Sequence, residues 1–375
     1  MRKPKNIFSL VIILLVFISF QIFCKAAKEN QVIEIGAILP LTGTGSEIGQ
    51  QHKMGLDLAV EEINNSGGIN NKSLIIKYED DKNDQKLTVT AFNKLADIDK
   101  VPLIITVMSG PSMAIYPLSI QKEVVLFANC GHPEITSLSN WVFRNFPTSK
   151  HEAETMVKFA KNKLGLSSLA ILYVNDAFGE AAMKTMRQKF QEYDGVISAV
   201  ESFEKDGADF RSSITKILQA NPQAVYVYGY GKSNGLIVKQ LRESGYSKYI
   251  LGSYNFSVEP TISIAKDALE GSFFTEPSFN PQSLDPKTVA FVSAFRRKFN
   301  MEPVWNAVLE YDAVNIIKKA LEKNSTSGPV IKATLEQVGD YEGIAGKYIY
   351  SDHGEWVVDL KVETIKDGKI VNVEW

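Results

Sequence analysis

The sequence predicts an α/β protein made of two lobes, each a doubly wound parallel sheet. Short β-branched runs alternate with amphipathic segments, and this alternation starts afresh near Pro147. Strand–helix–strand alternation favours a parallel sheet with helices on both faces. The 375 residues suit two domains of roughly 150 residues each. Two sheets in one chain fit this pattern better than a single sheet of about a dozen strands.

The first half is expected to contain four strands and three helices. In the first helix Met54, Leu58 and Ile63 recur near one face, which is typical of an amphipathic helix, and Gly67-Gly68 then turns the chain into the next strand. The expected strands are Val32–Leu39, Leu74–Tyr78, Leu103–Val107 and Val124–Ala128, and the helices are Gln50–Asn64, Leu87–Ile98 and Ser112–Gln121.

The second half repeats the alternation and then adds a C-terminal region. Helices are expected at His151–Leu164, Glu180–Phe190, Phe210–Gln219 and Gly235–Ser244, with strands at Leu169–Val174, Val196–Phe203, Val225–Tyr228 and Tyr249–Leu251. Past Gly271 the patterns predict the helices Pro286–Phe299 and Asn306–Glu322 and the strands Tyr348–Tyr350 and Val357–Thr364. Composition does not assign this tail to either lobe.

Composition and charge exclude several classes of protein. The chain is 45% hydrophobic and 22% charged, which is ordinary for a globular protein. A net charge of −2 offers no basic surface for nucleic acid. The two cysteines, Cys24 and Cys130, cannot form a disulfide scaffold. Because the four histidines are scattered, we expect neither a metal site nor a cofactor.

The N-terminal segment predicts export. Basic residues at positions 2, 3 and 5 precede the apolar run Leu10–Ile18, which is the charge order of a signal peptide over residues 1–24. Cys24 follows the run, and its placement resembles the lipid-attachment cysteine of a bacterial lipoprotein signal. Gln21 and Phe23 depart from that motif, so the alternative is cleavage near Ala26 or Ala27. The membrane is therefore expected to be contacted through the signal peptide or a lipid anchor.

Loops at the ends of the expected strands carry a candidate ligand site. In open parallel sheets ligands bind beyond the carboxyl ends of the strands. Pro40–Gly49, Ser109–Ser112 and Asn129–Gly131 follow three of these strands and are rich in glycine and hydroxyl residues. Glycine lets backbone N–H groups approach a ligand, and a helix N-terminus favours an anion. The loops predict capture of a small anion such as a carboxylate; the alternative for Ser112 is that it only caps its helix.

Aromatic residues follow the expected strands of the second half. Phe178, Tyr228, Tyr230, Tyr254 and Phe256 all stand near strand ends. Their shared position predicts a wall that closes over the ligand, although aromatic residues are more often part of a core.

The sequence does not match the catalytic or nucleotide-binding motifs that it partly resembles. Gly43–Gly49 is one residue too long for the dinucleotide fingerprint. Gly231-Lys232-Ser233 resembles the end of a phosphate loop, yet Tyr226 stands where that loop needs glycine. Neither G-x-S-x-G nor H-E-x-x-H occurs. We therefore expect a binding protein and not an enzyme; an enzyme on a doubly wound fold is the less favoured alternative.

Several segments resemble a known family. They are I-G-A-I-L-P-L-T-G at 35–43, G-L-D-L-A-V-E-E-I-N-N-S-G-G-I at 55–69, Y-E-D-D at 78–81, Y-G-Y-G at 228–231, L-R-E-S-G-Y at 241–246 and E-Y-D-A-V at 310–314. In order along the mature chain they are similar to type I periplasmic binding proteins, in particular the leucine/isoleucine/valine-binding class that serves ABC transporters.

The resemblance implies two lobes that are joined by a three-segment hinge and close on a ligand. Lobe 1 would comprise 32–146 plus 276–350, and lobe 2 would comprise 147–275 plus 351–375. The ligand-binding residues that it implies, together with those of the loops above, are Ser109, Gly110, Ser112, Asn129, Cys130, Gly131, Phe178, Tyr230 and Tyr254.

The chain departs from the amino-acid binders of this family at the expected site. Tyr254 stands where they place an acid for the ligand ammonium, Gly131 replaces a threonine and Ile48 a tyrosine. The family's cysteine pair is also absent, which leaves Cys130 as a free thiol near the cleft. A buried ammonium without a carboxylate partner is costly. Either another acid such as Glu276 or Glu310 takes this role, or the ligand lacks an ammonium.

The sequence therefore predicts an exported, extracytoplasmic substrate-binding component of an ABC importer. It would be periplasmic or lipid-anchored, would act as a monomer beside a permease, and would bind a branched-chain amino acid or a related small carboxylate-bearing solute. The alternative keeps the fold and makes the protein a ligand sensor that presents its closed form to a receptor or kinase.

Overall fold

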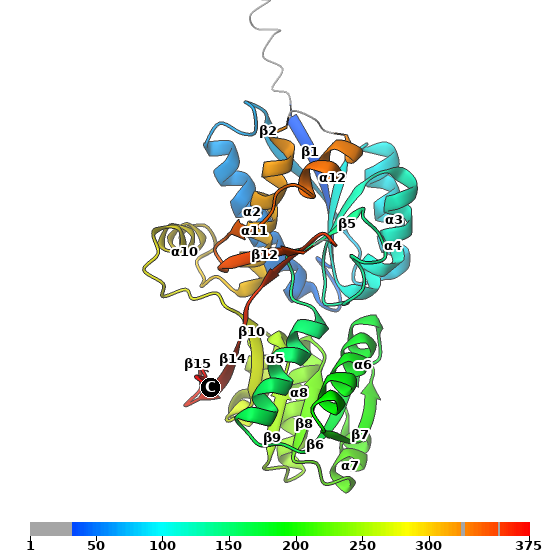
Figure 1. The fold of residues 1–375 in the computed structure, drawn as a ribbon, viewed down its shortest axis with the longest axis vertical. Coiled ribbons are helices and arrows are strands. Elements are labelled where there is room, and N and C mark those ends of the chain that lie inside the picture. The colour runs from blue at the N-terminus through cyan, green and yellow to red at the C-terminus, as the bar shows by residue number, and fades with distance from the viewer. Residues whose placement is uncertain (1–31, 324–326, 352) are drawn as a thin grey trace, which may run out of the picture.

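A computed structural model describes residues 32–323, 327–351 and 353–375 of the chain. Two α/β lobes lie one above the other along the long axis of the molecule (Figure 1). Each lobe contains its own sheet, and a small three-stranded sheet accompanies the first lobe. The predicted signal peptide, residues 1–24 with the candidate lipid-attachment residue Cys24, lies outside the described residues. Within the described part of the chain no helix combines the length and the apolar character needed to cross a bilayer.

The first lobe is built on a five-stranded parallel sheet with the order β2-β1-β3-β4-β5. Its central strands consist of aliphatic runs, and every residue of β3 and β4 is buried, as expected for a sheet covered on both faces. The strands are β1 (Val32–Leu39), β2 (Ser73–Asp80), β3 (Leu103–Val107), β4 (Val125–Asn129) and β5 (Val142–Phe143).

In the part of the chain that the structure describes, six helices accompany this sheet. They are α2 (Ser46–Asn65), α3 (Gln85–Asn93, continued by a π-helical turn at Lys94–Ile98), α4 (Ser109–Lys122), α10 (Pro286–Phe299), α11 (Trp305–Leu321) and α12 (Gly328–Leu335). Helix α4 begins three residues before its predicted start at Ser112. This shift matters because each residue of a helix turns the side-chain direction by about 100°.

The second lobe contains a seven-stranded sheet with the order β15-β14-β10-β9-β8-β6-β7. β6 to β10 are parallel, whereas β14 pairs antiparallel with β10 and with β15. The strands are β6 (Ser168–Val174), β7 (Val196–Phe203), β8 (Ala224–Tyr228), β9 (Tyr249–Gly252), β10 (Phe273–Pro277), β14 (Leu360–Lys366) and β15 (Lys369–Asn372). The helices are α5 (Ser149–Asn162), α6 (Ala177–Glu192), α7 (Arg211–Gln219), α8 (Gly231–Glu243) and α9 (Thr261–Ala265), with 3₁₀ turns at Tyr254–Phe256 and Lys266–Leu269.

The chain crosses between the lobes three times. The first crossing lies between β5 and α5, the second between β10 and α10, and the third at Asp359 between β13 (Glu355–Val358) and β14. The two-lobed α/β fold with a three-segment hinge is therefore confirmed.

The third crossing differs from its predicted place. The prediction assigned residues from 351 onward to lobe 2 and treated Val357–Thr364 as one strand. Instead β13 pairs with β12 (Lys347–Ser351), which pairs with β11 (Tyr341–Glu342). Trp356 of β13 stacks on Phe127 of the first sheet at 6.1 Å. The chain changes sheets at Asp359 because the apolar side chain of Trp356 is buried in lobe 1.

Candidate ligand-binding site

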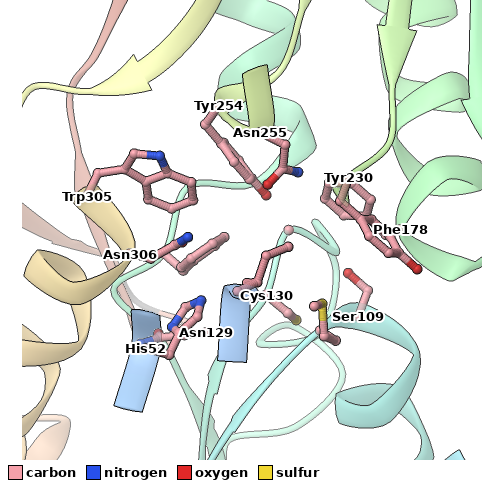
Figure 2. A pocket seen from close by; sticks show the side chains of 14 residues that line it. His52, Ser109, Asn129, Cys130, Phe178, Tyr230, Tyr254, Asn255, Trp305 and Asn306 are labelled. Atoms are coloured by element: carbon pink, nitrogen blue, oxygen red, sulfur yellow. The ribbon is translucent and has the colours of Figure 1, made fainter. Parts of the chain in front are cut away.

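A pocket lies between the two lobes, at the carboxyl ends of their central strands (Figure 2). The space there that the centre of a water molecule can occupy is about 30 Å³, enough for roughly two waters. Its polar lining residues are His52, Ser109, Asn129, Asn255 and Asn306, and its apolar and aromatic ones are Ile48, Met108, Cys130, Gly131, Phe146, Phe178, Tyr230, Tyr254 and Trp305. In this arrangement side chains from both lobes fill most of the cleft.

The end of β3 supplies Ser109, the first residue of α4. The Ser109 side chain is 2% exposed, and its Oγ has no hydrogen-bond partner among the described residues. A buried hydroxyl without a partner is uncommon in folded proteins. Because Ser109 also lies at a helix N-terminus, where the backbone favours negative charge, its hydroxyl is suited to donate to an anionic ligand.

The end of β4 supplies Asn129, Cys130 and Gly131. A Cβ atom on Gly131 would lie 2.8 Å from Phe178 Cε2 and 2.8 Å from the Tyr254 hydroxyl, which is closer than non-bonded atoms approach. Glycine at this position therefore lets two aromatic side chains of the second lobe reach the loop of the first. The threonine of the amino-acid binders would not fit here without moving them.

Arg144 lies beneath this loop and fixes its direction. The buried guanidinium donates to the carbonyl oxygens of Cys130 (3.4 Å), His132 and Pro133 (3.0 Å), and pairs with Glu355. Burial lowers the pKa of Arg144 to about 10, so the group stays cationic at neutral pH. In a trans peptide the N–H points opposite to the carbonyl. The Gly131 N–H therefore points away from Arg144, and Gly131 lines the pocket.

His52 of α2 forms part of the pocket's floor together with Asn129. Its Nδ1 lies 2.8 Å from Glu310 Oε1, and Asn129 Nδ2 donates to the same oxygen at 2.9 Å. The imidazole stacks on Phe146 with ring centroids 5.9 Å apart. His52 and Glu310 are fully buried. Glu310, on α11, thus holds two side chains of the floor without itself lining the pocket.

The second lobe supplies the facing wall. Tyr230 donates to Asp176 Oδ2 at 2.7 Å, and Phe178 packs against Tyr228 with ring centroids 4.6 Å apart. Burial raises the pKa of Asp176. Because both rings are held from behind, they present fixed surfaces to the cleft.

Buried Glu152 of α5 holds the Tyr254 segment in place. Its Oε1 accepts from the backbone N–H of Tyr254 at 3.1 Å and from the Thr275 hydroxyl at 2.7 Å, and its Oε2 accepts from Tyr228. Burial raises the pKa of Glu152 to about 7 against the lowering effect of these hydrogen bonds.

Trp305 and Asn306, at the start of α11, complete the lining on the hinge side. The Trp305 ring lies 4.7 Å from Tyr254 and 5.6 Å from Phe146, centroid to centroid. Asn306 donates to Gln51 at 2.7 Å, while its Oδ1 is buried without a partner among the described residues. The cleft therefore combines aromatic surfaces with neutral polar groups.

Comparisons with known proteins agree with this architecture. The periplasmic binding protein family model matches residues 32–369. The chain belongs to the periplasmic binding protein family. It is 28% identical over 366 residues to Leu/Ile/Val-binding protein homolog 3 of Brucella melitensis (94% of this chain, 96% of the relative). It is 26% identical over 339 residues to the leucine-, isoleucine-, valine-, threonine- and alanine-binding protein of Pseudomonas aeruginosa (89% of each).

A solved relative shares the fold of this periplasmic binding protein. It is the branched-chain amino acid transporter substrate-binding protein LivJ of Streptococcus pneumoniae in complex with isoleucine, with a TM-score of 0.83 and 25% identity over 92% of this chain and all of that one. The family consists of solute-binding proteins and not of enzymes, so the expectation of a non-catalytic binder is confirmed.

In this periplasmic binding protein most of the predicted site residues meet at one place. Those that line the pocket are Ser109, Asn129, Cys130, Gly131, Phe178, Tyr230 and Tyr254. Gly110 and Ser112 do not. The Ser112 hydroxyl donates to the carbonyl of Met108 at 2.8 Å. Ser112 does not cap the helix, because α4 starts three residues earlier than predicted. The thiol of Cys130 is free and buried, and burial raises its pKa.

The two candidate acids for a ligand ammonium do not line the pocket. Glu310 lies below His52 and Asn129. Glu276 lies in β10 beside Lys361 and Glu363, and it lines a different cavity on the hinge side of Trp305.

Seven lining residues were not predicted as site residues from the sequence: Ile48, His52, Met108, Phe146, Asn255, Trp305 and Asn306. The sequence offered one signal for His52. This residue follows Ile48, a position of the expected site, by four residues, so the two side chains share one face of α2.

Proposed function

We propose that this protein is the extracytoplasmic substrate-binding component of an ABC importer. Its solute would be a branched-chain amino acid or a related small carboxylate-bearing molecule. The names of the relatives and of the isoleucine complex support this class of ligand. The protein would be exported and would act in the periplasm or at a lipid anchor, as its family supports.

One observation carries the proposal: the strand-end loops of the two lobes face each other across a buried, partly polar pocket. A ligand placed there touches both lobes and is removed from water when they close. The closed form then differs in shape from the open form around a hinge, and such a difference is what a permease can recognise.

A ligand screen tests this function. We expect leucine, isoleucine, valine or a matching carboxylic acid to raise the unfolding temperature of the purified mature protein, because a ligand that binds only the folded state stabilises it. Isothermal titration calorimetry then gives the affinity. If no small carboxylate at millimolar concentration binds, the proposed ligand class is wrong.

A further inference from the structure

The residues that line the pocket include no acidic side chain. All of them belong to the described part of the chain, and none is aspartate, glutamate, lysine or arginine. His52 is the one basic side chain among them. A ligand ammonium inside this pocket would therefore lose its water without gaining an anionic partner, which is strongly unfavourable.

Three carboxylates beside the pocket accept hydrogen bonds from residues that line it. Glu310 accepts from His52 and Asn129. Asp176 accepts from Tyr230 and, at 3.0 Å, from the backbone N–H of Gly179. Glu152 accepts from Tyr228, Thr275 and the backbone of Tyr254. Each acid thus stands behind the wall of the pocket, where it holds an uncharged group or an imidazole toward the ligand.

Negative charge is favoured at the loops of the first lobe that follow β3 and β4. The Ser109 hydroxyl is buried without a partner among the described residues, and the Gly131 N–H is directed away from Arg144. The Arg144 cation lies below the same loop, and the N-terminus of α4 adds partial positive charge. These groups can satisfy one carboxylate.

The remaining surface is apolar. Phe178, Tyr254 and Trp305 surround the centre of the cleft (Figure 2), and Phe146 also lines it. Neighbouring rings among these four have centroids 4.7–6.4 Å apart. Such surfaces suit a branched aliphatic or an aromatic body.

We propose that the solute is a carboxylate without an ammonium group, whose acid end binds at Ser109 and Gly131 and whose apolar body lies among the aromatic rings. This inference rests on the proposed solute-binding function and narrows its ligand from carboxylates in general to those that lack a charged amine.

Matched ligand pairs test the inference on the unaltered protein. Calorimetry would compare leucine with 4-methylpentanoate and phenylalanine with 3-phenylpropanoate, because each pair differs only in the amino group. We expect the amine-free acid of at least one pair to bind at least tenfold more tightly. Equal or tighter binding of the amino acid overturns the inference and leaves the proposed function standing. Binding of neither member of either pair overturns the inference, and the proposed function falls with it only if no other small carboxylate of the screen binds.

A variant supplies the missing charge. Asn306→Asp puts a carboxylate into the lining at nearly constant volume, next to Gln51, whose amide can turn to donate. We expect the ratio of amino-acid affinity to amine-free-acid affinity to rise at least tenfold. Asn300→Asp, at the exposed end of α10, is the control and should leave the ratio unchanged. An unchanged ratio in a folded Asn306→Asp protein contradicts the assignment of selectivity to the absent acid.

Discussion

Ser109 and Ser112 show how finely a single residue's position decides its role. Both are hydroxyl residues in the first turn of α4, and both are buried. Ser109 lines the pocket with its Oγ unpartnered among the described residues, whereas the Ser112 Oγ bonds back to Met108. Three residues rotate a helical side chain by about 300°, and the chain's geometry at β3 determines which serine faces the ligand.

The two serines give a prediction with its own control. We expect Ser109→Ala to weaken ligand binding about tenfold or more, because a hydrogen bond to a charged group is worth roughly 1.5–3 kcal/mol. Ser112→Ala should change the affinity by less than about twofold, since the Ser112 hydroxyl donates to the backbone carbonyl of Met108 and not to the ligand. Calorimetry with the tightest ligand from the screen measures both. Equal losses, or a larger loss at Ser112, would remove Ser109 from the site.

At the scale of elements, helix α5 connects the hinge to the ligand wall. It follows the first crossing, and its buried Glu152 accepts hydrogen bonds from residues near the ends of β8, β9 and β10. The Tyr254 backbone is thereby held against the hinge. Glu152 thus sets the position of the Tyr254 side chain through a hydrogen bond to the Tyr254 backbone.

The raised pKa of Glu152 predicts that the stability of the protein depends on pH. That pKa is raised from 4.5 to about 7 in the folded protein, so the folded state binds this proton more tightly than the unfolded chain does. The stabilisation that results is complete below about pH 4.5 and is lost as the pH rises through about 7.

Glu152→Gln, which mimics the protonated acid, should remove this dependence. Between about pH 4.5 and 8 the difference in the free energy of unfolding between the variant and the parent should change by about 3 kcal/mol. Urea unfolding at several pH values measures it. Glu154→Gln is the control on the same helix, where the side chain is 37% exposed. Parallel curves for Glu152→Gln and the parent protein would contradict the assignment.

At the scale of the whole molecule, the lobes touch at the mouth of the cleft. Thr44 of lobe 1 donates to Asp206 of lobe 2 at 2.6 Å, and Lys205 donates to the Asn83 carbonyl at 3.3 Å. These contacts join residues of different lobes, so they stabilise the closed state and do not involve the ligand directly.

Removing one of these contacts should make the closed complex shorter-lived. We expect Thr44→Ala to raise the dissociation rate of the ligand about two- to tenfold, the range that follows from a net hydrogen-bond contribution of roughly 0.5–1.5 kcal/mol. Stopped-flow measurement tests this. Thr90→Ala, whose hydroxyl bonds within α3, should have no effect. Equal rates for Thr44→Ala and the parent protein would show that this contact does not stabilise closure.

Much of the fold could be predicted because its signals are local. Aliphatic runs such as Leu103–Val107 gave strands within a residue of those observed, and the restart of the pattern near Pro147 gave two lobes. The small sheet was harder to predict. Nothing in the run from Trp356 to Thr364 shows that the chain changes partners at Asp359, since both parts alternate in the manner of a strand and pairing is decided by distant residues.

The sequence by itself determined which loops meet at the ligand, because the carboxyl ends of parallel strands always gather at one edge of a sheet. Ser109, the Asn129–Gly131 loop, Phe178, Tyr230 and Tyr254 follow from that rule. Only the tertiary structure decided that His52 and Asn306 join them and that Glu152, Asp176 and Glu310 lie behind the wall. These outcomes depend on how helices α2 and α11 pack against the sheet. Such packing is a property of contacts between segments more than 200 residues apart, which no local pattern records.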